Sequence, residues 1–217
     1  MIFLLAHIFS LTFFDKNTYS TFHPEIVRVV DATDHLLLRG NIPRDPSGNF
    51  CIFDLLQSIP ALPPYDFTIF SLLTFEREDE AAFIEKLQEF EWDHSQHWIW
   101  RQVRAHFKDP RPTDTSLLTG QTFEGKFLRF PELVDQVFTL MHTPFSQRRV
   151  IYFHCRHGCN RSSALAAAYL MRCGVPFEEA WKREVETYPI YEPHELANFL
   201  SLYEKLLKER RTSFTNN

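Results

Sequence analysis

The chain has 217 residues, 44% of them hydrophobic and 24% charged, which is the balance of a soluble globular domain with a sizeable core. Its formal net charge of −5 argues against a protein that tracks long nucleic acids, and 4 cysteines are too few for a disulfide scaffold. We therefore expect a monomer of a reducing, cytoplasmic compartment that binds no long nucleic acid.

The N-terminus is apolar over residues 1–14, with His7 as an interruption. This run is too short to span a bilayer, no Lys or Arg precedes Lys16, and no small-residue cleavage site follows it. We interpret residues 1–24 as an apolar segment packed on the domain. A cleaved signal or a segment lying on a membrane surface is the alternative for residues 1–14.

The remaining chain alternates between strand-like and helix-like patterns. Apolar runs and β-branched or aromatic clusters predict strands at 25–31, 35–40, 66–73, 97–107 and 150–153. Helical spacing, with acids or proline in several first turns, predicts helices at 78–90, 130–142, 162–174, 176–188 and 192–211. This order predicts an α/β domain with a central, mostly parallel sheet flanked by helices. We assign residues 25–210 to one domain and residues 211–217 to a flexible tail.

The stretch from Phe153 to Ser163, FHCRHGCNRSS, follows the apolar run 150–153 and leads into a helix. Ligands of such sheets bind beyond the carboxyl ends of strands, and a helix N-terminus with inward N–H groups binds anions. Gly158 would let the backbone approach an anion, and Arg161 can donate two hydrogen bonds to phosphate oxygens. The predicted phosphate-binding residues are Arg156, His157, Gly158, Cys159, Asn160, Arg161 and Ser162.

Cys155 would lie at the floor of this loop. Inward N–H groups, the helix dipole and nearby cations favour its thiolate over the thiol, and a thiolate beside a bound phosphate is a nucleophile. The chemistry predicted is attack by Cys155 on phosphorus, a thiophosphoryl intermediate and hydrolysis. Since the loop and Arg161 would stabilise the developing charge, we expect neither a metal nor a cofactor.

At these residues the chain resembles the cysteine-dependent phosphatases of the protein tyrosine phosphatase superfamily. HCRHGCNRS fits their signature H-C-x-x-G-x-x-R-[ST], and the similarity to the dual-specificity branch extends over residues 25–207, most clearly from 128 on. The resemblance implies that branch's three-layer domain and a phosphorylated substrate. It further implies that Cys155 is the nucleophile, Arg161 clamps the phosphate, Ser162 aids thiolate breakdown and His154 orients the loop.

The family also uses an aspartic general acid on a loop between the preceding strand and helix. Here that loop is FKDPRPTDTSLLTGQ, which offers Asp109 at the end of the strand and Asp114 nearer to Cys155. We favour Asp109, with Asp114 as the alternative and Glu124 as a further one. Either aspartate could instead cap a turn beside its proline.

The substrate stays open among several phosphorylated compounds, with a phosphoprotein as the default. Arg156 and His157 add charge to the loop rim, which suits an inositol phosphate or phosphoinositide. His157, Gly158, Asn160 and Arg161 are also similar to an RNA 5′-triphosphatase branch, although the two serines at 162 and 163 depart from it.

Two rival interpretations give the loop another role. Cys155, Cys159, His154 and His157 could bind zinc, but no second pair of ligands follows at the usual spacing. The chain could also be an inactive phosphate-binding module, against which the intact Cys155 and Arg161 speak. Cys159 could trap an oxidised Cys155 as a disulfide, or simply pack under the loop.

Overall fold

The structure is a computed structural model of the whole chain. It describes residues 25–30, 34–42, 65–72, 85, 100–104, 130–187, 190 and 193–215. The apolar segment 1–14 and the loop 108–121 lie outside the described residues. Of the helix predicted at 78–90, only Glu85 is described, and it is helical.

The strands form a five-stranded sheet of order β1-β2-β5-β3-β4. Their bounds are β1 Glu25–Val30, β2 His35–Gly40, β3 Tyr65–Ser71, β4 Trp100–Arg104 and β5 Arg148–His154. β2, β5, β3 and β4 pair in parallel, and β1 pairs with β2 in antiparallel direction. The prediction of a mostly parallel sheet is therefore confirmed. β5 lies between β2 and β3, so it is the central strand that the apolar run 150–153 indicated.

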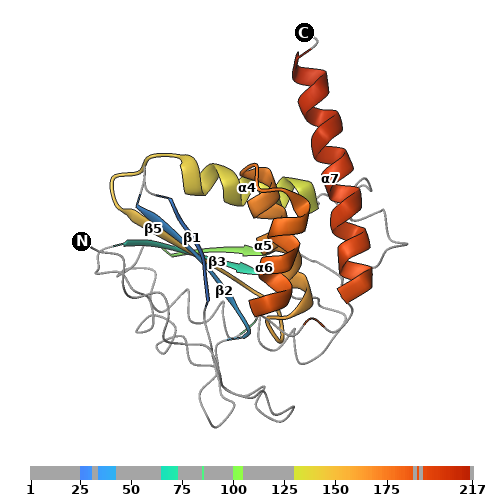
Figure 1. Cartoon of the computed structure of the whole chain (residues 1–217). Helices are drawn as coiled ribbons and strands as arrows, with labels where there is room; N and C mark the ends of the chain where they lie inside the picture. The colour runs from blue at the N-terminus through green and yellow to red at the C-terminus, as the bar shows by residue number, and fades with distance from the viewer. Residues whose placement is uncertain are drawn as a thin grey trace, which may run out of the picture.

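Four helices are described, and Figure 1 shows them gathered on one side of the strands. They are α4 Phe130–His142, α5 Asn160–Arg172, α6 Phe177–Thr187 and α7 Pro193–Thr215. α5 begins at Asn160, before its predicted start at residue 162, and ends at Arg172, before its predicted end at residue 174. α7 runs to Thr215, through residues that we predicted as tail, and its C-terminal end extends away from the other elements (Figure 1).

Helix α5 is the centre of the core on this side of the sheet. Every residue from Arg161 to Met171 is buried, and α4, α6 and α7 all pack against it. Three alanines in succession, Ala166 to Ala168, let the neighbouring helices approach closely. The opposite face of the sheet is buried as well, at Leu36, Leu38, Phe67, Ile69, Val150 and Tyr152. A strand buried on both faces is typical of a parallel sheet.

A buried ion pair joins β5 to β3 at the end of the sheet where both strands begin. Arg149 Nε lies 3.2 Å from Asp66 Oδ2, and Arg149 Nη1 donates to the carbonyl of Leu140 at 3.0 Å. His35 lies beside this pair: its Nδ1 accepts from the Arg149 amide at 3.1 Å, and its Nε2 lies 3.2 Å from the Thr143 carbonyl. These contacts require the tautomer of His35 that is protonated only on Nε2.

Candidate functional site

The sequence-predicted loop joins the carboxyl end of β5 to the first residue of α5. Cys155, at 3% exposed, is buried, as are Gly158, Cys159, Arg161 and Ser162; Arg156 and Asn160 are half-buried and His157 is exposed. The structure therefore brings the predicted phosphate-binding residues together at the edge of the sheet where parallel strands usually present a ligand site.

The Cys155 thiol contacts the first turn of α5. Its Sγ lies 3.4 Å from the Ser162 Oγ, and both groups are buried. The Ser162 hydroxyl is thus within hydrogen-bonding distance of the Cys155 sulfur.

Arg161 points back toward the end of β3. Its Nη1 donates to the Leu72 carbonyl at 2.7 Å, and only 4% of the residue is exposed. The Leu72 amide in turn donates to the His154 carbonyl at 2.8 Å, which fastens the chain after β3 to the end of β5. A main-chain carbonyl therefore holds the guanidinium beside the loop, where a planar group can engage phosphate oxygens.

His154 lies on the opposite face of the sheet from Cys155. Its Nε2 lies 2.8 Å from the Ser71 Oγ, and its ring stacks on Tyr152 with centroids 5.8 Å apart. Side chains of successive strand residues point to opposite faces, so His154 and Cys155 do not converge on one ion. Among the described residues, no group of three or more His, Cys, Asp or Glu side chains is arranged to hold a metal.

The N-terminus of α5 has features of an anion site. Within the described chain, the N-cap residue Cys159 makes no side-chain capping hydrogen bond, and the first turn contains no acidic residue. The positive end of the helix dipole is therefore not neutralised by its own first turn. The Cys159 Sγ instead donates to the His157 carbonyl at 3.3 Å, inside the loop. No disulfide joins Cys155, Cys159 and Cys173 to one another.

Gly158 is where the loop meets the chain that leaves β2. Its φ is +76°, and a Cβ at this position would lie 3.0 Å from both the Asn41 nitrogen and the Gly40 carbonyl carbon. The contact continues on both sides: the Ile42 amide donates to the Arg156 carbonyl at 3.4 Å, and Tyr152 Oη donates to the Asn41 carbonyl at 2.5 Å. Only glycine fits this conformation and this distance without displacement.

Sequence reasoning missed a buried ion pair beneath the loop. Arg39 and Glu184 are 0% and 1% exposed, and their Nη2 and Oε2 atoms lie 3.1 Å apart. Arg39 Nη1 also donates to the Ser163 Oγ at 2.6 Å and to the Gly158 carbonyl at 3.4 Å. The available signal was a charge at the end of an apolar strand, LLLRG, and a glutamate on the inner face of α6 next to Ala180.

The predicted general acids Asp109, Asp114 and Glu124 lie outside the described residues, so their placement relative to Cys155 stays a prediction. No helix among the described residues is long and apolar enough to cross a membrane.

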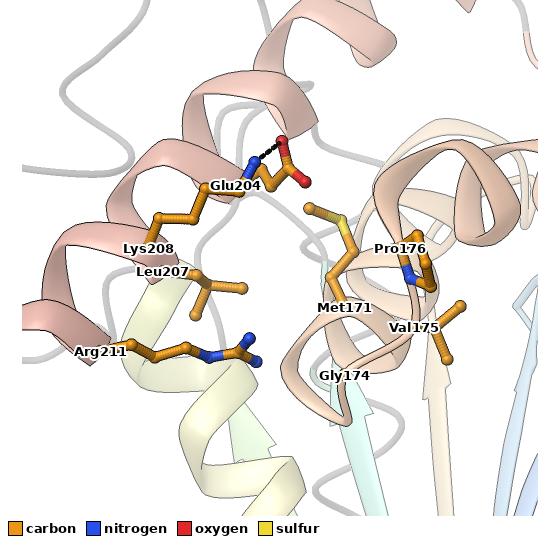
Figure 2. A pocket seen from close by; sticks show the side chains of 8 residues that line it. All are labelled: Met171, Gly174, Val175, Pro176, Glu204, Leu207, Lys208 and Arg211. Atoms are coloured by element: carbon orange, nitrogen blue, oxygen red, sulfur yellow. Dashed lines mark ion pairs between the residues drawn. The ribbon is translucent and has the colours of Figure 1, made fainter.

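A small hollow of about 90 Å³ lies at the other end of α5 (Figure 2). Met171 and Gly174 border it on one side and α7 on the other, where Lys208 and Glu204 form an ion pair at 2.9 Å. A helix of 13 residues is about 20 Å long, so this hollow is remote from Cys155. It is not part of the candidate site, which is the loop at the N-terminus of α5.

No protein-family model matches the chain, and no curated protein is significantly similar to it in sequence. Solved structures are similar in fold. A kinase-associated phosphatase whose catalytic-site cysteine is replaced by serine is 14% identical, with a TM-score of 0.52 over 86% of this chain and 96% of that one. A mouse putative dual-specificity phosphatase is 18% identical, with a TM-score of 0.46 over 93% of this chain and 97% of that one. The Cydia pomonella phosphatase PTP-2 is 17% identical, with a TM-score of 0.49 over 83% and 89%. The chain therefore has an α/β fold of the dual-specificity phosphatase type, as predicted.

Proposed function

We propose that the chain is a phosphoric monoester hydrolase with Cys155 as its nucleophile, acting as a tyrosine or dual-specificity protein phosphatase. One observation carries the proposal. A buried thiol at the carboxyl end of the central strand lies 3.4 Å from the Ser162 hydroxyl, at the start of α5. The N-cap residue of this helix makes no side-chain capping hydrogen bond. The fold and the signature HCRHGCNRS support the same chemistry.

In the first step the Cys155 thiolate attacks phosphorus, an S–P bond forms and the P–O bond to the leaving group breaks. The loop amides and Arg161 stabilise the charge on the phosphoryl oxygens, which is the largest contribution that a preorganised site usually makes. Asp109, or alternatively Asp114, protonates the leaving oxygen.

In the second step water attacks phosphorus and the S–P bond breaks, which releases phosphate and regenerates the thiolate. The Ser162 hydroxyl is placed to donate to the departing sulfur, because it is 3.4 Å away in the free protein. The same aspartate, now ionised, accepts a proton from the water. Atoms and charge balance without a further reactant.

The substrate carries a phosphoryl group that must pass the residues at the rim of the loop to reach the buried Cys155 thiol. Arg156 and His157 are the half-buried and the exposed members of that rim. Cations there favour a dianionic phosphate and acidic flanking groups, whether on a peptide or on a small molecule. The overall resemblance to dual-specificity enzymes makes a phosphoprotein the proposed substrate.

The test is phosphate release at mildly acidic pH by the wild type, Cys155→Ser and Cys173→Ser. Phosphotyrosine and phosphothreonine peptides, phosphoinositides, inositol hexakisphosphate and 5′-triphosphate RNA form the substrate panel. We expect Cys155→Ser to lose at least about a thousandfold in kcat. Cys173→Ser serves as the matched control and keeps wild-type activity, because Cys173 lies at the far end of α5.

Rapid quenching of the wild type, followed by mass spectrometry of the peptide that contains Cys155, detects the thiophosphoryl intermediate. An active Cys155→Ser variant contradicts the mechanism. A wild type that binds inorganic phosphate but releases none from any substrate identifies an inactive phosphate-binding module instead. A preference for one member of the panel names the substrate class.

A further inference from the structure

Arg39 is a buried cation near the end of β2 that contacts the loop and both α5 and α6. It lies on the face of the sheet that carries the helices, opposite Phe153 in the parallel pairing of β2 with β5. Glu184 of α6 holds it at 3.1 Å, and Ser163 of α5 accepts from it at 2.6 Å. Burying a guanidinium costs free energy unless partners such as these compensate its charge. The same two contacts hold the Arg39 side chain in one position.

The third contact of Arg39 is with the loop itself. Arg39 Nη1 donates to the Gly158 carbonyl at 3.4 Å. A peptide group is planar and trans, so its C=O and its N–H point in opposite directions. The Cys159 N–H therefore points away from Arg39. The hydrogen bond from Arg39 to the Gly158 carbonyl therefore also sets the direction of the Cys159 N–H, which belongs to the same peptide group.

The neighbouring peptide groups are held in the same manner. The Ile42 amide holds the Arg156 carbonyl at 3.4 Å, and the Cys159 Sγ holds the His157 carbonyl at 3.3 Å. Three successive carbonyls of the loop, those of Arg156, His157 and Gly158, thus accept hydrogen bonds. The N–H groups of the same three peptide planes, on His157, Gly158 and Cys159, point away from these partners. Arg39 is the charged member of this set of partners.

We propose that Arg39 is a positioning residue for phosphate binding, and that Glu184 keeps it in place. The proposal rests on the proposed function of the loop. Arg39 does not touch the substrate: it orients the Gly158–Cys159 peptide by its hydrogen bond to the Gly158 carbonyl. Glu184 fixes the guanidinium and offsets its charge enough for burial.

The test compares Arg39→Lys with Arg149→Lys in the full chain. Lysine keeps the charge but cannot donate in the planar fork of arginine. Arg149 is a matched control, because it is also buried on a strand of the same sheet. Its Nε lies 3.2 Å from a buried carboxylate, and it donates to a main-chain carbonyl as well, but at the end of the sheet away from the loop. Glu184→Gln is the second variant.

For each protein we would measure kcat, KM, the inhibition constant of inorganic phosphate and the free energy of unfolding in denaturant. We expect Arg39→Lys to raise the inhibition constant of phosphate about tenfold or more and to lower kcat/KM. Arg149→Lys loses stability to a similar extent but keeps the wild-type inhibition constant. Glu184→Gln changes the phosphate affinity in the same direction as Arg39→Lys.

A folded Arg39→Lys that binds phosphate within twofold of the wild type overturns the proposal, and so does an Arg149→Lys with an equally weakened affinity. If Arg39→Lys does not fold, a folded Glu184→Gln with wild-type phosphate affinity overturns it. In each of these cases the wild type is active, so the proposed function stands. A wild type that neither releases nor binds phosphate overturns both.

Discussion

The loop geometry predicts that Gly158→Ala damages phosphate binding far more than Gly174→Ala does. Both glycines have positive φ, +76° at Gly158 and +96° at Gly174. A Cβ at Gly158 would meet the Asn41 nitrogen and the Gly40 carbonyl carbon at 3.0 Å. A Cβ at Gly174, which borders the hollow in Figure 2, would meet nothing within 4 Å. Both substitutions place alanine at a positive φ, but only Gly158→Ala also brings a Cβ into steric conflict with neighbouring backbone atoms.

The magnitudes follow from these two terms. Holding alanine in the left-handed region costs about 1–2 kcal/mol at either position. Carbon atoms in contact prefer about 3.5–4.0 Å, so the loop at Gly158 must move by about 0.5 Å or more from the chain after β2. Overpacking of this kind costs a further 1–3 kcal/mol, roughly. We therefore expect Gly158→Ala to lose about 2–5 kcal/mol of stability and Gly174→Ala about 1–2 kcal/mol.

The displaced loop also carries the N–H groups that would bind phosphate, so the functional effect is larger than the stability effect alone. We expect at least about a tenfold loss in kcat/KM and in phosphate affinity for Gly158→Ala, and wild-type values for Gly174→Ala. Steady-state kinetics, phosphate inhibition and urea unfolding measure these quantities. Equal stability losses in the two variants, or a Gly158→Ala with wild-type phosphate affinity, would refute the reasoning.

Two further predictions concern titrating groups. Asp109→Asn should lower kcat by about 10²–10⁴ on alkyl phosphates and much less on aryl phosphates with acidic leaving groups, while Asp114→Asn should stay near the wild type; the reverse pattern would assign the acid to Asp114. Burial lowers the pKa of His35 below its usual 6.5, and the Arg149 cation lowers it further. The hydrogen bond to the Thr143 carbonyl and the carboxylates of Asp34 and Asp66 act in the opposite direction but do not outweigh burial. The unfolded chain then binds more protons, so stability should fall as pH drops below about 6.5, by at most about 1.4 kcal/mol per pH unit. His35→Asn should flatten this dependence in denaturant titrations between about pH 5 and 7.5, and an unchanged slope would show that other groups cause it.

The elements of the fold were largely predictable, because they follow from local periodicity. Helix α4 was predicted at 130–142, the range observed, because Pro131 and the spacing of Leu133, Val134 and Val137 mark both its start and its buried face. β5 was recognisable as a central strand from an uninterrupted apolar run. The ends of α5 and α7 were less accurate, since loop geometry and packing shift the last turn of a helix.

The candidate site was predictable only where its residues are contiguous. Cys155 to Ser162 lie in one stretch, so a strand, a tight loop and a helix N-terminus place them together by chain connectivity alone. The residues that support the loop, in contrast, are far apart in the sequence. Arg39 reaches the Gly158 carbonyl across 119 positions of sequence, and Arg161 reaches the Leu72 carbonyl across 89.

The sequence by itself thus determined the order of the elements and the loop after β5, in which it predicts the nucleophile, because turn chemistry and hydrophobic spacing act between near neighbours. Only the tertiary structure decided that β2 and β3 flank β5, and hence which distant groups hold the loop. Strand order sets those partners, and strand order results from long-range packing that no local pattern encodes. The buried pair of Arg39 and Glu184 became visible only once β2 and α6 lay against the same helix.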